Sequence, residues 1–275
     1  MALTLTQQVE NNISIEANGI IPGLLRGQTT GQIKSLMVAC GNEMIALGEL
    51  FSVSGAMDQT ETVVFDGFLK NVHGIGMEMG SGVIQICGDT GNRVGLKMSG
   101  GKIRSLANVG NHVGTEMTGG VIVVEGNAGD SAGAALPGSK VGVNRGTILV
   151  RGDVGKGAGE SMRRGMLVVG GDAGEVLGWS MRAGTLVVLG KSGAHVGAEM
   201  KRGTIVLGGG LADALPPSFR QGGRFRMPAV SLITNWLRQT HPDFEVDLSQ
   251  LDTEFDLFHG DFLRGGRGEV LVPAS

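Results

Sequence analysis

The stretch that decides the fold is NVGNHVGTEMTGGVIVVEG, residues 108–126, because it is one copy of a repeated nineteen-residue unit. Two later copies are DAGEVLGWSMRAGTLVVLG at 172–190 and KSGAHVGAEMKRGTIVLGG at 191–209. Each copy begins with a small polar or charged residue, carries glycine at unit positions 7 and 13 and methionine at position 10, and ends in an apolar run closed by glycine. A fixed period of this length predicts a solenoid, in which repeated units stack on one another.

Seven such units fill residues 70–209, and they begin at Lys70, Asp89, Asn108, Asn127, Asp153, Asp172 and Lys191. Six have nineteen residues, and the unit at Asn127 has seven extra residues near 136–142. We expect this insertion to bulge from a turn, because the strands must stay in register. A nineteen-residue unit is too short for a strand, a helix and two loops, and frequent glycine disfavours helices. The sequence therefore predicts an all-β fold, a parallel β-helix of seven coils.

Apolar columns predict which side chains point inward. Positions 15 and 17 alternate along one strand and are almost all Ile, Leu or Val, so both face the interior. Position 6 is apolar as well, and methionine at position 10 suits a flexible filler stacked on itself. Glycine at positions 7 and 13 marks tight corners, where positive φ or a close backbone approach is needed.

The ends of the chain are less regular. Residues 1–69 contain strand-like runs at 13–17 and 62–67 and a third candidate at 35–41. Residues 210–275 contain a loop-like stretch at 211–223, a helix-like segment at 229–238 and a strand-like run at 269–272. Stacked coils expose unpaired backbone at both ends and need covers. We therefore expect an N-terminal cap at 1–69, the coils at 70–209 and a C-terminal covering extension at 210–275.

The composition narrows the class of protein. The chain has 275 residues, of which 41% are hydrophobic, 18% are charged and 50 are glycine. A net charge of −3 gives no general reason to expect nucleic-acid or membrane binding. The N-terminal MALTLTQQVE lacks the basic and apolar regions of a secretory signal, and no apolar run approaches eighteen residues. We expect a cytoplasmic globular protein.

Chemistry-bearing residues do not form a recognisable constellation. The many GxG triplets recur with the unit and no helix follows them, so they indicate corners and not a dinucleotide site. His112 and His195 share a column but lie four coils apart, about 19 Å, and cannot share one metal ion. Cys40 and Cys87 do not make a disulfide framework. We assign no catalytic residue, no metal site and no cofactor to this chain.

Two outward columns predict contact surfaces. The first, here called the outer stripe, is apolar at position 16 in the last five units, where the first two carry Gln85 and Arg104. Such a stripe indicates a cover, either the chain's own helix at 229–238 or a partner subunit. Its residues are Val123, Leu149, Val168, Val187 and Val206.

The second column is basic and lies at positions 11 and 12 of the last four units; we call it the basic ladder. Like charges at this spacing repel one another. It is either a solvated corner or a contact for an acidic partner or polyanionic ligand. Its residues are Arg145, Arg163, Arg164, Arg182, Lys201 and Arg202.

The motif GTEMTGGVIVVEG at 114–126, with its repeats, resembles the C-subunit of the formylmethanofuran dehydrogenase family. It is also similar to the GXGXG β-helix domain at the C-terminal end of glutamate synthase large subunits. The resemblance covers about half the chain directly, and LFSVSG at 50–55 and GGRGE at 265–269 also look like the C-subunit. It implies a subunit of a one-carbon-transfer complex. The regular repeat without a catalytic constellation, together with the outer stripe, predicts that the chain is a non-catalytic scaffold that holds the catalytic subunits.

The resemblance offers two settings. In methylotrophic bacteria, a formyltransferase/hydrolase complex hydrolyses a formylated methanofuran-type carrier to formate during formaldehyde oxidation, without redox metals. In methanogens, a complex with molybdenum or tungsten and iron–sulfur clusters reduces CO2 onto methanofuran. The implied partners are amidohydrolase-like, formyltransferase and molybdoenzyme-like subunits. The chain lacks the charge-rich composition of hyperthermophile proteins, which favours the methylotroph setting.

Two further expectations complete the prediction. The bacterial carrier is implied by the resemblance to be polyglutamylated, so the basic ladder would steer it or an acidic subunit.

The alternative function, from another class of protein, is a free-standing β-helix enzyme that acts on polysaccharide. That enzyme would need clustered carboxylates and aromatic platforms on the outer face. The outward columns show neither, and Trp179 is the only tryptophan in the repeat.

Overall fold

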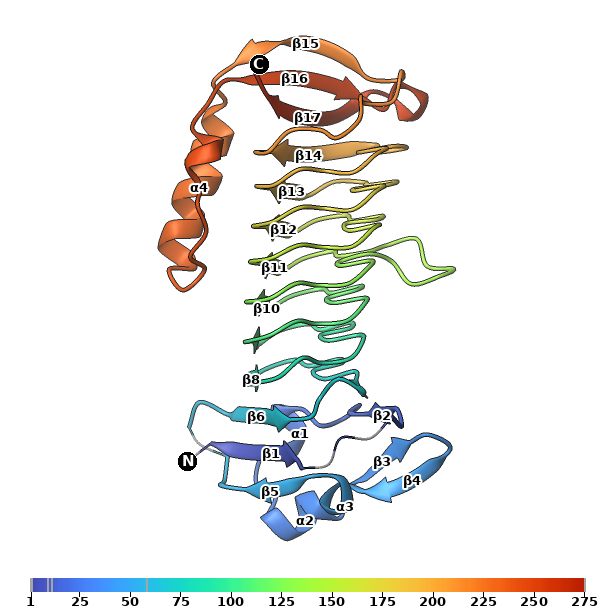
Figure 1. The fold of residues 1–275 in the computed structure, drawn as a ribbon, viewed down its shortest axis with the longest axis vertical. Helices are drawn as coiled ribbons and strands as arrows, with labels where there is room; N and C mark the ends of the chain where they lie inside the picture. The colour runs from blue at the N-terminus through green and yellow to red at the C-terminus, as the bar shows by residue number, and fades with distance from the viewer. Residues whose placement is uncertain (1, 9, 11, 58, 275) are drawn as a thin grey trace.

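The computed structural model describes residues 2–8, 10, 12–57 and 59–274. It is a mostly β molecule with a thirteen-stranded sheet, largely parallel, and a four-stranded sheet. The large sheet has the order β15-β16-β17-β14-β13-β12-β11-β10-β9-β8-β6-β1-β5. Figure 1 shows these strands stacked along the long axis of the molecule, with α4 beside the stack.

The middle of the large sheet is built from the repeat. One strand from each unit pairs in parallel with the strand of the next unit, and position 15 lies against position 15, as in Ile84↔Ile103 and Ile103↔Ile122. The pairing Ile122↔Ile148 keeps this register across the longer fourth unit. The insertion therefore leaves the strands undisturbed, as expected. The strands are β8 (Val83–Ile86), β9 (Lys102–Ser105), β10 (Val121–Val124), β11 (Thr147–Val150), β12 (Met166–Val169), β13 (Thr185–Val188) and β14 (Arg202–Leu207).

Other sides of each unit are also bonded to the next unit. A run of single parallel bridges joins position 2 of successive units, for example Val109↔Ala128 and Ala128↔Val154. Near the methionine, the amide of Ser99 donates to the carbonyl of Met79 at 2.8 Å, and Thr118 does the same to Met98 at 2.8 Å. The backbone of each unit is thus satisfied by its neighbours along several sides.

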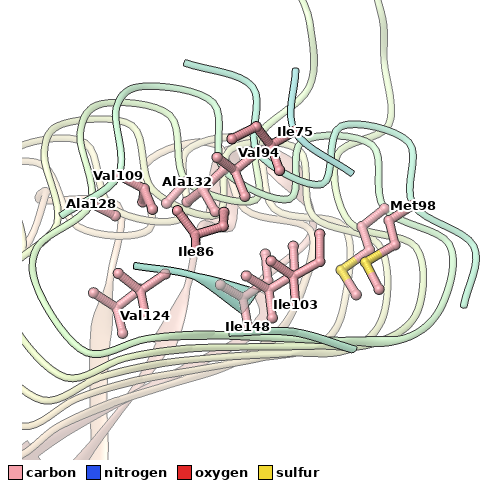
Figure 2. Packing of buried hydrophobic residues seen from close by; sticks show 14 of the residues in the cluster. Ile75, Ile86, Val94, Met98, Ile103, Val109, Val124, Ala128, Ala132 and Ile148 are labelled. Carbon is pink, nitrogen blue, oxygen red and sulfur yellow. The ribbon is translucent and has the colours of Figure 1, made fainter. Parts of the chain in front are cut away.

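The predicted inward columns form the core. Ile103, Ile148 and Met98 are fully buried, and Figure 2 shows Ile103 and Ile148 stacked beside Met98 inside the turns of the chain. Ile75, Val94 and Ala132, at position 6, close the opposite side of the same interior. The prediction for these columns is confirmed. Methionine fills the end of the interior because it adapts to irregular gaps.

The corners also follow the prediction. The glycines at unit positions 7 and 13 have positive φ, for example 61° at Gly114 and 86° at Gly120. Two further corner positions, 5 and 9, hold side chains in the same left-handed region, such as His112 at 65° and Glu116 at 56°. The sequence did not predict a positive φ at positions 5 and 9, because residues other than glycine seldom adopt this conformation.

The asparagine or aspartate that opens five of the seven units has a structural role that the repeat pattern did not reveal. The side-chain oxygen Oδ1 of Asn108 accepts the amide of Asn127 at 2.8 Å, and Oδ1 of Asn127 accepts that of Asp153 at 2.8 Å. A second ladder runs through position 4, where Oδ1 of Asn92 accepts the amide of Asn111 at 2.8 Å. Each ladder satisfies a turn amide that has no strand partner.

The N-terminal region continues both sheets. β6 (Thr62–Gly67) pairs in parallel with β8 and with β1 (Leu3–Gln7), which pairs with β5 (Ser52–Ser54). The small sheet contains β2 (Ile15–Glu16), β3 (Met37–Cys40), β4 (Glu43–Ala46) and β7 (Val72–His73). Three short helices, α1 (Pro22–Leu25), α2 (Thr30–Lys34) and α3 (Leu47–Leu50), lie between them. The strand predicted at 62–67 is confirmed, and those at 13–17 and 35–41 are present but shorter.

The C-terminal region ends the large sheet. β17 (Arg267–Pro273) pairs in parallel with β14, then β16 (Phe255–Gly260) and β15 (Arg220–Phe225) add antiparallel strands. The predicted helix is α4 (Pro228–Thr240), and the predicted strand at 269–272 lies within β17. Two short 3-10 helices are η1 (Ser249–Leu251) and η2 (Phe262–Arg264). The loop predicted at 211–223 is wrong from residue 220 onward, where β15 begins. Its two glycines and two charged residues masked the strand.

We expect His73 to make the stability of the fold depend on pH. Its Nδ1 accepts the amide of Asn92 at 2.8 Å, so the fold uses the neutral ring. Burial lowers the pKa of His73, Glu16 opposes this shift and Arg93 adds to it. A folded pKa below the ordinary value of about 6.5 means that the unfolded chain binds the proton more readily. We expect full stability above about pH 6.5, lost as the pH falls through the lowered pKa.

The substitution His73→Asn provides the matched control. Asparagine already serves at this unit position in Asn92 and Asn111, where Oδ1 accepts the next amide and does not titrate. Thermal unfolding between pH 8 and pH 5 is expected to show a smaller loss in this variant than in the unmodified chain. Some loss remains in the variant, because burial and then Lys102 lower the pKa of His241 as well. Equal losses in the two proteins would contradict this role for His73.

Candidate partner-binding surfaces

The outer stripe is covered by the chain itself. Val123 is 4% exposed, and the other four stripe residues are fully buried. They belong to a second hydrophobic cluster, distinct from the interior of the repeat, together with Val230 and Leu237 of α4 and Phe244, Leu248 and Leu251 beyond it. We call residues 228–251 the C-terminal cover; Figure 1 shows α4 standing alongside the sheet strands.

This geometry decides between the two covers that the sequence left open. The chain's own helix and the segment after it occupy the outer stripe. A partner placed directly on Val123, Leu149, Val168, Val187 and Val206 does not fit the structure, because their side chains are already removed from solvent. That part of the predicted partner interface is corrected: a partner would meet the outside of the C-terminal cover.

A charged network holds the tip of the cover where the outer stripe turns polar. Glu125 lies between Arg104, at 2.8 Å, and Arg151, at 3.0 Å. Nη2 of Arg151 donates to the backbone carbonyl of Asp243 at 3.2 Å, and the Asp243 carboxylate lies 3.9 Å from Arg104. Half-exposed pairs of this kind contribute little stability each. They explain why Arg104 stands in a column that is apolar further along.

The outside of the C-terminal cover has two hollows, both lined by α4 and by the chain that follows it. One hollow, of about 510 Å³, is lined by polar residues that include Ser231, Asn235 and Asp252. The other, of about 430 Å³, is lined by Pro242, Phe244 and Val246 among others. Arg238 and Leu248 border both hollows. These hollows were not foreseen, because they form between α4 and the chain that follows it, where the sequence carries no repeated pattern.

The basic ladder forms a continuous surface. Arg163, Arg182 and Lys201 follow one another up the stack, because the amide of each donates to the preceding unit, to Val143, Met162 and Met181 at 2.8, 2.8 and 2.7 Å. Arg182 is half-buried, and the other five ladder side chains are exposed. Within the part of the chain that the structure describes, no acidic side chain pairs with any of the six. A contact with a partner or polyanion stays a prediction.

The residue types that usually carry catalysis lie apart. His112 and His195 occupy equivalent corners with φ of 65° and 61°. No group of three His, Cys, Asp or Glu among the described residues could hold a metal ion. Cys40 is buried and Cys87 is half-buried, and both are free thiols. No helix in the described ranges is long and apolar enough to cross a membrane.

Known proteins resemble parts of this chain in sequence. No model of a known protein family matches the chain. The C-subunit of the tungsten-containing formylmethanofuran dehydrogenase 2 of Methanothermobacter marburgensis is 31% identical over 90 residues, which are 32% of this chain and 33% of that protein. The C-subunit of the molybdenum-containing formylmethanofuran dehydrogenase 1 of the same organism is 35% identical over 91 residues, 33% of this chain and 23% of that protein. The matched region thus spans a third or less of these relatives.

A solved structure matches over the whole length. It is a chain in the crystal structure of the formyltransferase/hydrolase complex FhcABCD from Methylorubrum extorquens in complex with methylofuran. The TM-score is 0.88 and the sequence identity is 31%, with 99% of this chain and 100% of that chain covered. The similarity therefore includes the N-terminal and C-terminal regions as well as the repeat.

Proposed function

The chain belongs to the C-subunit family of the formylmethanofuran dehydrogenases, and from this premise we propose that it is a structural, non-catalytic subunit. It holds the catalytic subunits of a complex that processes formyl groups on methanofuran-type carriers. The observation that carries the proposal is the match over the whole chain to a component of FhcABCD. The dispersed titratable residues support a scaffold role, since catalysis needs groups held within reach of one another.

The finer architecture is part of the proposal. We infer a parallel β-helix of seven coils at 70–209, with an N-terminal cap at 1–69 and a covering extension at 210–275. The in-register strands, the second run of bridges and the bonded corners support closed coils. A stack of this kind is stiff, because every coil packs on two neighbours along its whole contour. Stiffness is the property that a scaffold supplies.

The extent of similarity favours the hydrolytic complex. The methanogen proteins match about a third of the chain, whereas the bacterial chain matches nearly all of it. We therefore propose a formyltransferase/hydrolase complex with formyltransferase, amidohydrolase-like and molybdoenzyme-like partner subunits, in the cytoplasm, and with no cofactor bound by this chain. The molybdenum- or tungsten-dependent dehydrogenase is the second candidate, favoured by the names of the methanogen relatives.

Two exposed surfaces of the chain are candidates for contacts with partner subunits. The outside of the C-terminal cover is one candidate, because it presents two hollows and the exposed Leu232. The basic ladder is the other, as a contact for an acidic subunit or for a polyglutamylated carrier. Unpaired cations at an exposed corner attract carboxylates over a Debye length of about 8–10 Å.

Activity measurements test the scaffold role. The chain purified alone is expected to show no hydrolysis of a formylated carrier. The complex purified through a tag on this chain is expected to hydrolyse that carrier and to contain neither molybdenum nor tungsten. Turnover by the isolated chain would contradict the non-catalytic role, and a bound molybdenum or tungsten centre in the complex would select the second candidate.

A further inference from the structure

A hollow on the corner opposite to the C-terminal cover has the chemistry of an anion site. Its volume is about 250 Å³, and it lies between Lys140 of the insertion and Arg264 of η2. Ser161 and Ser180 line it at unit position 9, and Arg182 and Lys201 line it from the basic ladder. Figure 1 shows the yellow-green insertion projecting from the stack on the side away from α4.

The two serines open the hollow. Other units carry a longer charged side chain at the same position: Glu78, Lys97, Glu116 and Glu199. Backbone conformation does not select serine, because φ is 53° at Ser161 and 61° at Glu199. The difference between the units is therefore one of side-chain length. Short side chains in two consecutive units leave room above the corner.

Charge inside the hollow is unbalanced. Lys140, Arg182 and Lys201 have no acidic partner within the described part of the chain. The one carboxylate that lines the hollow, Glu199, already accepts Nη2 of Arg264 at 2.7 Å and Oγ of Ser180 at 3.3 Å. Three cations thus face the hollow with no internal counter-charge. The Ser161 hydroxyl lies beside them, whereas that of Ser180 already donates to Glu199.

The size of the basic surface indicates an extended ligand. From the unit of the insertion to the unit of Lys201 the stack rises by three strand spacings, roughly 14 Å. An extended peptide rises about 3.3 Å per residue, so about four residues would span this length. Guanidinium groups pair with carboxylates in two-point geometry, and the Ser161 hydroxyl can donate to a remaining lone pair.

We propose that this hollow binds an extended acidic segment of a partner subunit, with carboxylates at Arg182 and Lys201 and beside Lys140. The proposal deepens the scaffold function and rests on it, because the segment belongs to a subunit that the scaffold holds. The insertion then has a role: it supplies Lys140, which closes one end of the site.

The test uses the assembled complex. The double variant Arg182→Glu/Lys201→Glu is compared with Lys156→Glu/Lys191→Glu, which makes the same charge change on exposed lysines in the same part of the repeat, outside the hollow. Assembly with the co-purified partner subunits is measured at 50 mM and 300 mM NaCl. We expect the first variant to assemble at least tenfold more weakly at low salt and to lose most of the salt dependence. The control variant is expected to assemble like the unmodified chain.

Two competitors identify the ligand class. A hexaglutamate peptide is expected to weaken assembly of the unmodified chain, whereas inorganic phosphate at equal total charge has little effect. Equal competition by phosphate would overturn the extended-segment proposal. Thermal unfolding of each variant, and the milder Arg182→Gln/Lys201→Gln with an intermediate effect, separate a binding defect from a folding defect.

The outcomes distinguish the hollow proposal from the scaffold function. Normal assembly of the first variant with unchanged salt dependence would overturn the hollow proposal and leave the scaffold function standing. Normal assembly with a raised KM for the carrier would also overturn it, since the hollow would then serve the carrier. Failure of the unmodified chain to assemble would overturn both.

Discussion

Replacing Val187 with aspartate is expected to detach the C-terminal cover and to lower the stability of the protein by about 3 kcal/mol or more. Val187 is fully buried between the sheet and the cover, in the same cluster as Leu237 and Phe244. A carboxylate at this place loses its hydration, and the surrounding apolar side chains offer no replacement. The midpoint temperature of thermal unfolding is expected to fall by about 6 °C or more, because each kcal/mol of lost stability lowers it by about 2 °C or more.

The same column offers a control. Gln85 occupies position 16 of the first unit and is half-exposed, so Gln85→Asp introduces the same group at a place that the cover does not reach. Its midpoint is expected to stay within about 1 °C of the unmodified protein, as for other surface changes. Limited proteolysis adds a direct readout, because a detached cover exposes 228–251 to cleavage. Equal melting of the two variants would show that the outer stripe is not sealed by this segment.

The second large effect is expected from Gly119→Ala. A methyl group on Gly119 would overlap the backbone carbonyl oxygen of Ser99 in the preceding unit. Gly119 is absent from the residues with positive φ, so the effect reports the close approach of two units and not backbone strain. Overpacking between rigid backbones is expected to cost about 3 kcal/mol, the upper end of the usual range. Urea unfolding monitored by circular dichroism gives the change in free energy.

Gly80→Ala is the matched variant for this experiment. Gly80 lies at the same corner of the first unit, one unit position before that of Gly119, and the atom nearest to an added methyl group is Oγ of Ser99 at 3.6 Å, an ordinary contact distance. We expect a change of less than about 1 kcal/mol there, because the added group meets no backbone atom and the corner belongs to neither a helix nor a strand. A similar loss in both variants would mean that the corners are not packed as closely as the structure has them.

The structure of the repeat was predictable because the same unit recurs seven times in the sequence. Seven copies of one unit show which positions alternate, so the inward columns and the corner glycines could be assigned without a structure. The strands at 3–7, 43–46 and 52–54 had no such redundancy and were missed. The first and last of these strands pair with residues far apart in the chain, as in Leu5↔Val53, and local pattern says little about such contacts.

The sequence predicted that the outer stripe is a contact surface, but it did not predict which segment covers it. The apolar residues of the outer stripe required a cover, and sequence alone could not choose between the chain's own helix and a partner, because both bury the same side chains. The first asparagine and aspartate ladder was visible as a polar residue at the start of five units. Its purpose appeared only when the next unit's amide was seen beside each Oδ1, as for Asn108 and Asn127. The hollow at the insertion needed three segments in space, so no linear pattern could show it.

Native mass spectrometry of the chain co-expressed with its formyltransferase and amidohydrolase-like neighbours tests the scaffold claim most directly. The account predicts a stoichiometric complex that contains this chain, and loss of that complex when the chain is omitted. A chain that stays monomeric while its neighbours assemble and turn over carrier without it would contradict the claim.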